Sequence, residues 1–162
     1  MHAVFNAGVG LVFAAASMGQ LLAPRPAAVQ HVTVASGAAA DAVAPGGSVS
    51  LWVDVMPKPN IHVYGPGAKE FTPVALKVSP APGTKALKPK YPAPELLESP
   101  GSDKPVPVYR TQFRIVQPIA VSKTAKPGQT LDISGTLNYE SCDERLCYPL
   151  LSIPINWTVK VR

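Results

Sequence analysis

The chain has 162 residues, which is long enough to bury a core. Its composition, 46% hydrophobic and 15% charged, excludes a disordered chain. Its formal net charge of +5 comes from 15 basic and 10 acidic residues. The tightest basic cluster, residues 85–90, holds three lysines and no aromatic residue, which argues against a nucleic-acid-binding protein. Nineteen prolines and twelve glycines argue against long helices and favour short strands joined by turns.

The N-terminal segment has the composition of an export signal. Residues 1–23 contain no Lys, Arg, Asp or Glu, residues 4–13 can serve as the apolar h-region although they include Asn6, and Ala14–Ala16 fits a small-x-small cleavage site. We therefore expect residues 1–28 to be a signal peptide and a Pro/Ala linker, followed by one domain over residues 29–162. An uncleaved leader that anchors the protein in the membrane is the alternative.

Short strands are predicted along the first two thirds of the domain. They cover residues 29–34, 48–55, 61–64, 74–78 and 108–121, and apolar and polar residues alternate most clearly over 48–55. The stretch from Pro80 to Pro107 is rich in proline and has little periodicity. We expect it to be an irregular loop, in which only Glu95–Glu98 could form a helical turn.

The last third of the domain has the pattern of a long hairpin. One alternating apolar run ends at Tyr139, another begins at Ile153 and contains Trp157, and a short polar turn lies between them. Together with the five earlier segments, these two runs give about seven predicted strands. The sequence thus predicts an all-β fold, an antiparallel β-sandwich, with an OB-type barrel as an alternative without particular support.

The only two cysteines, Cys142 and Cys147, lie where the two strands of this hairpin meet. Opposed residues of antiparallel strands are close enough for a disulfide. A bridge that closes six residues stabilises a fold by only about 2 kcal/mol. Reversible thiol–disulfide exchange fits a pair of this kind. One alternative is a structural disulfide that pins the hairpin. Another is a pair of thiolates that hold a soft metal ion, but the sequence lacks further soft ligands nearby.

The segment from Tyr139 to Pro149, Tyr-Glu-Ser-Cys-Asp-Glu-Arg-Leu-Cys-Tyr-Pro, resembles the N-terminal periplasmic domain of the thiol:disulfide interchange (DsbD) family. The similarity extends through residues 108–115 and, more weakly, residues 61–66. The family has a second proline after Cys-Tyr-Pro, where this chain has Leu150. The resemblance implies an immunoglobulin-like sandwich over residues 29–162 and a periplasmic location. We expect this chain to work as a standalone exported protein.

The resemblance also implies roles for residues at the site. Cys142 and Cys147 would be the catalytic pair, with Cys147 forming the mixed disulfide. An aromatic-tipped loop would cap the pair, and its expected position, residues 99–108, contains no aromatic residue at its tip; Val106 or Val108 would then cover the cysteines. The residues expected to line the site are His62, Tyr64, Tyr109, Tyr148 and Pro149.

The function implied by the resemblance is that of an electron shuttle. The pair would reduce disulfides of thioredoxin-fold periplasmic proteins, including those of cytochrome c maturation, and would be re-reduced by a membrane reductant conductor. We expect no cofactor, no metal and no nucleic-acid partner. Acidic neighbours of Cys142 should keep the thiols weakly ionised at neutral pH. The alternative is a non-enzymatic immunoglobulin-like binding module whose disulfide only pins a hairpin.

Overall fold

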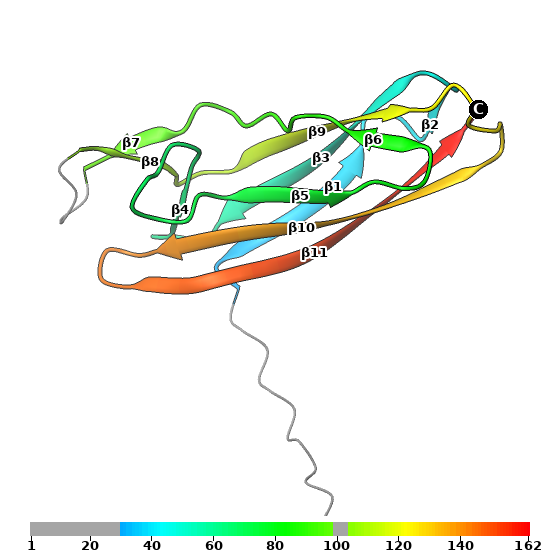
Figure 1. Ribbon diagram of the computed structural model, residues 1–162. Coiled ribbons are helices and arrows are strands. Elements are labelled where there is room, and N and C mark those ends of the chain that lie inside the picture. The colour runs from blue at the N-terminus through cyan, green and yellow to red at the C-terminus, as the bar shows by residue number, and fades with distance from the viewer. Residues whose placement is uncertain (1–29, 99–103) are drawn as a thin grey trace, which may run out of the picture.

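The computed structural model describes residues 30–98 and 104–162, which form an elongated sandwich of strands (Figure 1). The expected leader and linker, residues 1–28, lie outside the described residues, as do residues 99–103 of the expected cap segment. The described part contains eleven strands and no helix. Accordingly, no helix in these two ranges is long and apolar enough to cross a membrane.

One layer is a four-stranded antiparallel sheet with the order β1-β3-β9-β6. Its strands are β1 (Val32–Ala38), β3 (Ser48–Pro57), β9 (Phe113–Val121) and β6 (Thr84–Ala86). The strand predicted from alternation at residues 48–55 is β3, the second strand of this layer. Every second side chain of β3 is buried from Val49 to Pro57, because successive side chains of a strand point to opposite faces.

The other layer is built on the long hairpin of β10 (Thr130–Cys142) and β11 (Cys147–Val161). The order is β2-β11-β10-β4-β8-β7, and β5 also pairs with β10. The remaining strands are β2 (Ala42–Val43), β4 (His62–Tyr64), β5 (Ala75–Ser79), β7 (Glu95–Leu97) and β8 (Val106–Tyr109). The β10–β11 turn lies at the opposite end of the molecule from the C-terminus, and β4, β7 and β8 lie at the end with this turn (Figure 1).

The core between the layers contains the alternating residues of both sheets. Trp157 is 4% exposed and packs with Leu131, Ile133 and Leu137 of β10, as the hairpin pattern predicts. Its ring lies so close to Gly135 that a Cβ atom there would be 2.9 Å from Trp157 Cζ3. A side chain larger than hydrogen at position 135 would therefore displace the largest aromatic ring of the core.

The predicted fold class, an all-β immunoglobulin-like sandwich, is confirmed. The expected helical turn at Glu95–Glu98 is wrong, since Glu95–Leu97 forms β7 and pairs with Val106–Val108 of β8. The sheet edge offered by β8 gives this segment backbone partners that its local sequence does not reveal. The stretch from residue 80 to residue 107 also contributes β6, so it is less irregular than the sequence indicates.

Candidate functional site

The β10–β11 hairpin places the two cysteines directly opposite each other. Cys142 and Cys147 are paired residues in the ladder, with Cα atoms 4.0 Å apart, and their sulfur atoms form a disulfide. The expectation that the two cysteines can bond to each other across the hairpin is thereby confirmed.

The turn between the cysteines is organised by Asp143. One carboxylate oxygen, Oδ1, accepts the backbone N–H groups of Arg145 and Leu146 at 2.7 Å each, and Oδ2 accepts the hydroxyl of Tyr148 at 2.7 Å. These hydrogen bonds, with Tyr148 first and the two N–H groups next, lower the pKa of Asp143 below its ordinary value of 3.8. The ionised carboxylate therefore holds the backbone that joins Cys142 to Cys147.

We expect this turn to loosen only at low pH. Because the folded-state pKa of Asp143 is depressed, its contribution to stability is complete above pH 3.8 and is lost as pH falls through the folded value. Titration of the Leu146 amide by NMR should give a midpoint below 3.8, and Asp143→Asn should abolish this step. A midpoint at or above that value would show that the carboxylate does not hold the turn.

The two sulfur-bearing residues differ in exposure. Cys142 is 2% exposed and belongs to a small apolar cluster on the outer face of the second sheet, whereas Cys147 is exposed. Nucleophilic attack on a sulfur requires access to it. Of the pair, Cys147 is thus the residue that a partner molecule can approach from solvent.

Two of the predicted lining residues, His62 and Tyr64, lie beside the pair. His62 is opposite Cys142 in the β4–β10 ladder, and the hydroxyl of Tyr64 donates a hydrogen bond to Cys142 Sγ at 3.0 Å and lies 3.7 Å from Cys147 Sγ. Burial, with a smaller contribution from Glu140, raises the pKa of Tyr64 to about 12. At neutral pH the Tyr64 hydroxyl is therefore a permanent donor toward the sulfurs.

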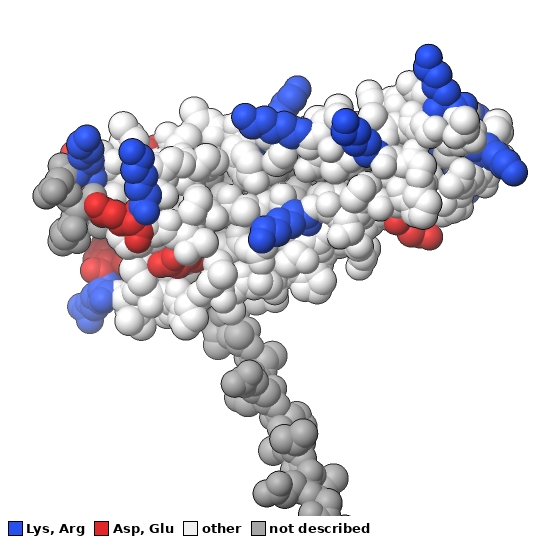
Figure 2. Space-filling view, in the orientation of Figure 1, with Lys and Arg blue, Asp and Glu red and all other residues white. Residues whose placement is uncertain are grey.

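Burial also lowers the pKa of His62, and the positive charge of Arg110 adds to this effect, while Asp143 opposes it. The imidazole is therefore neutral at physiological pH. His62, Tyr64 and the cysteines line an open cavity of about 850 Å³, formed at the hairpin end of the sandwich. Figure 2 shows acidic side chains gathered beside basic ones at this end of the molecule. The other residues that line the cavity include Asn60, Phe71, Leu97, Arg110, Glu144 and Leu146.

The disulfide is partly covered by a loop that connects β4 to β5, residues 65–73, which we call the 65–73 loop. The ring of Phe71 stacks on Tyr64, with centroids 4.0 Å apart and planes 4° from parallel. The N–H of Val74 donates to the carbonyl of Tyr64 at 2.8 Å, which ties the two ends of the loop together. The sequence pattern does not predict this role for Phe71, because the ring reaches Tyr64 only through the pairing of β4 and β5 with β10.

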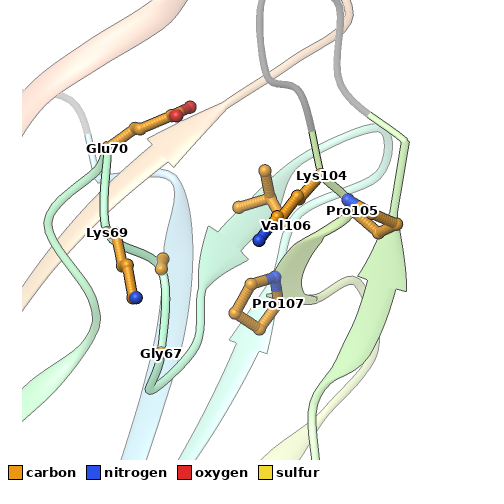
Figure 3. Close-up of a pocket in the computed structure, with 8 residues that line it drawn as sticks. Gly67, Lys69, Glu70, Lys104, Pro105, Val106 and Pro107 are labelled. Atoms are coloured by element: carbon orange, nitrogen blue, oxygen red, sulfur yellow. The ribbon is translucent and has the colours of Figure 1, made fainter.

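The sequence comparison with the family predicts the cap further along the chain, at residues 99–108. Val106 and Val108 are buried in the same cluster as Cys142 and Tyr64, so this segment packs beside the pair but presents no aromatic ring. A smaller cavity of about 280 Å³ lies between the 65–73 loop and residues 104–107, and it contains neither cysteine (Figure 3). The aromatic residue in the capping position is therefore Phe71.

The other three predicted lining residues are not among those that line the cavity. Tyr109 pairs with Val63 and lies in the main core, where it stacks on Phe113 and donates to the carbonyl of Pro92 at 2.7 Å. Tyr148 stacks on His31 and bonds to Asp143, so it supports the turn from the side. Pro149 is exposed where the β10–β11 register shifts.

Glu140 is a further charged group at the site that the sequence reasoning noted only for its charge. Its carboxylate and the two sulfur atoms all lie within 4.8 Å of one another, a grouping that could hold a metal ion among the described residues. Both sulfurs are in a disulfide, however, and a thiolate is the form of cysteine that ligates metals. We therefore assign no metal to this site.

Comparison with known proteins places the chain in a family. The family model described as "Thiol:disulfide interchange protein DsbD, N-terminal" matches residues 29–155. Among solved structures, the reduced DsbD N-terminal domain of Neisseria meningitidis is 18% identical, with 80% of this chain and 86% of that chain covered and a TM-score of 0.49. No curated protein sequence matches the chain.

The N-terminal periplasmic domain of ScsB from Proteus mirabilis is 16% identical, with 79% of this chain covered and a TM-score of 0.49. This chain spans 46% of that structure's length. Neither structure is similar enough to carry an argument, so the assignment rests on the family model and on the disulfide. Since that family model matches most of the chain and its cysteines form the expected bridge, the chain belongs to the family of DsbD N-terminal thiol–disulfide exchange domains.

Proposed function

We propose that this domain reduces disulfides of thioredoxin-fold periplasmic proteins through Cys142 and Cys147. The observation that carries the proposal is the asymmetry of the pair: a buried residue, Cys142, is bonded to an exposed one, Cys147, in a short turn. An exchange reaction needs one accessible nucleophile and a second thiol held beside it. Membership of the thiol:disulfide interchange family supports the same chemistry.

In the proposed reaction the reduced domain starts with two thiols. The Cys147 thiolate attacks one sulfur of the partner's disulfide, which breaks that bond, and the partner's other sulfur leaves as a thiolate and is protonated. The Cys142 thiolate then attacks Cys147 Sγ, closes the intramolecular disulfide and releases the partner's second thiol. Two electrons and two protons pass to the partner, and a membrane reductant conductor would restore the dithiol.

The energetics of the bridge suit this role. A disulfide that closes a loop as short as Cys142 to Cys147 stabilises the folded state by about 2 kcal/mol in the chain-entropy model. The sandwich core is separate from the pair, because Cys142 belongs to the small outer cluster and not to the main one. Opening and closing the bridge in each cycle should therefore leave the fold intact.

The experiment that tests the proposal is direct electron transfer. The reduced domain is mixed with an oxidised thioredoxin-fold protein of the disulfide isomerase class, quenched with acid and labelled with a maleimide. We expect the partner to gain two labelled thiols while the domain loses two. A Cys142→Ala/Cys147→Ala variant is the control. No transfer from the wild-type domain would favour the alternative, an immunoglobulin-like binding module with a structural disulfide.

Phe71 is the residue that should shield the pair from reagents other than its partners. Phe71→Ala removes the ring that stacks on Tyr64 and should open the cavity around the sulfurs. Reduction of the disulfide by dithiothreitol should become about threefold to tenfold faster, because access limits the rate of exchange. Val106→Ala is a control in the same cluster that leaves the ring in place. An unchanged rate for Phe71→Ala would show that the ring does not cover the pair.

We also propose that the domain works in the periplasm after removal of a signal peptide. The composition of residues 1–23 supports this location, and the periplasm is a compartment in which disulfides form and persist. Intact-mass measurement of periplasmic protein should give a chain that begins near Ser17 or in the following linker. Recovery of the full-length chain from membranes only would contradict this and favour the anchor.

A further inference from the structure

Glu140 lies at a break in the backbone pairing of β10. On one side, β5 pairs with residues 134–138 and β4 with Ser141 and Cys142, so position 140 faces the gap from which the 65–73 loop emerges. On the other side, the register with β11 shifts, so that Pro149 and Leu150 stand opposite the single residue Glu140. A bulge of this kind redirects the side chains near it.

The Glu140 carboxylate has two sets of neighbours. Oxygen Oε2 accepts the backbone N–H of Thr72 at 2.9 Å, and Thr72 follows Phe71 in the 65–73 loop. An oxygen of this carboxylate and the two cysteine sulfurs all lie within 4.8 Å of one another. Residues two apart on a strand share a face, which explains why the side chains of Glu140 and Cys142 meet. One charged group therefore accepts a hydrogen bond from the covering loop and lies within 4.8 Å of both sulfurs.

We propose that Glu140 is a positioning residue that couples closure of the 65–73 loop to suppression of the thiolates. The inference rests on the proposed exchange function. With the loop closed, the Thr72 N–H fixes the carboxylate beside the sulfurs, and its negative charge disfavours a second one on either cysteine. When a partner displaces the loop, the Thr72 bond breaks, the carboxylate is released toward solvent, and the thiolate forms where the partner can receive it.

The other charged and titratable groups around the pair come from β4, from β7 and the residue after it, from the residue after β8, and from the hairpin turn. Tyr64 donates to the sulfurs and is protonated at neutral pH, and His62 is neutral, so neither supplies a positive charge. Glu140 does not line the cavity, but among the described carboxylates it is the one grouped with both sulfurs. The remaining charged groups that line the cavity are Glu95, Glu98, Arg110, Asp143, Glu144 and Arg145.

Three variants of the full chain separate the effect of the Glu140 charge from that of the hydrogen bond between Thr72 and Glu140. Glu140→Gln removes the charge and keeps an oxygen that can accept from Thr72, Glu140→Ala removes both, and Glu144→Gln removes a charge from the same hairpin without touching the Thr72 bond. Two readouts are used. Alkylation of Cys147 by iodoacetamide is measured in the reduced protein as a function of pH, and exchange of the Thr72 amide is measured in the oxidised protein.

Glu140→Gln should lower the apparent thiol pKa by about 0.5 to 1 unit, which gives about threefold to tenfold faster alkylation at pH 7. Its Thr72 amide should stay protected, whereas Glu140→Ala should lose that protection and also react faster. Glu144→Gln should change alkylation by less than about twofold, since an exposed charge is screened. A merely structural role would change amide exchange without moving the pH profile.

The inference is overturned if Glu140→Gln leaves the pH profile unchanged or shifts it no more than Glu144→Gln. It is also overturned if Glu140→Ala leaves the Thr72 amide protected. Neither readout uses a partner protein. If the wild-type domain transfers electrons while the Glu140 variants behave like wild type, this inference fails and the proposed function stands. If the wild type transfers none while the variants behave as expected, the proposed function fails and the electrostatic assignment of Glu140 stands.

Discussion

A Cys142→Ser variant should accumulate a mixed disulfide with a thioredoxin-fold partner through Cys147. The Cys147→Ser variant should accumulate at least about tenfold less of this mixed disulfide. The reason is access: Cys147 is exposed, and Cys142 is 2% exposed beneath the 65–73 loop. Without Cys142 no thiol remains to resolve the intermediate, so it persists. Non-reducing electrophoresis followed by mass-spectrometric mapping of the cross-linked peptide identifies the sulfur involved.

The surroundings of the two cysteines point the same way. Tyr64 donates to Cys142 at 3.0 Å, and Cys142 also packs in the small apolar cluster, so it is held in place for an intramolecular attack. Cys147 follows the exposed turn of Asp143 to Leu146. A cross-link found consistently at Cys142 would reverse the two roles. Absence of any cross-link in both variants would count against exchange itself.

Trp157→Ala should be the most damaging of the substitutions considered, with a loss of about 3–5 kcal/mol in the free energy of unfolding. The ring is 4% exposed in the main core and fills the space beside Gly135. Urea or guanidinium unfolding followed by circular dichroism measures the loss. A cost below about 1 kcal/mol would show that the core tolerates the cavity.

Two control variants put the expected loss for Trp157→Ala in context. Trp52 is the other tryptophan, it is only half-buried, and it lies under the guanidinium of Arg114 at 4.4 Å from the ring centroid. Trp52→Ala should therefore cost clearly less than Trp157→Ala. Replacement of both cysteines by Ala should cost about 2 kcal/mol or less and leave a folded domain. If the cysteine variant unfolds, the bridge is structural and the proposed cycle is excluded.

The features that could be predicted from the sequence are those that depend on neighbouring residues. Alternation predicted β3, β10 and β11, because the side chains of a half-buried strand face the core at every second position. The spacing of Cys142 and Cys147 predicted their bond, since opposition across a hairpin is fixed by the turn that joins its strands. These parts of the fold and of the site need no knowledge of distant contacts.

The features that escaped prediction depend on pairing between distant segments. Phe71 reaches Tyr64 only because β4 and β5 both pair with β10 and the 65–73 loop must bridge the gap. Tyr109 lies in the core because its partner in the β4–β8 ladder is Val63, and a shift of one residue would have placed it on the cavity side. No local pattern in the sequence sets either register.

The reduction potential of the Cys142–Cys147 disulfide tests the central claim most directly. The domain is equilibrated in dithiothreitol or glutathione buffers of defined potential, quenched with acid, and the fraction of alkylated thiols is measured. An exchange function predicts a single two-electron transition above about −300 mV, within reach of thioredoxin-fold partners. A transition below about −300 mV is typical of a structural disulfide and would contradict the proposed function.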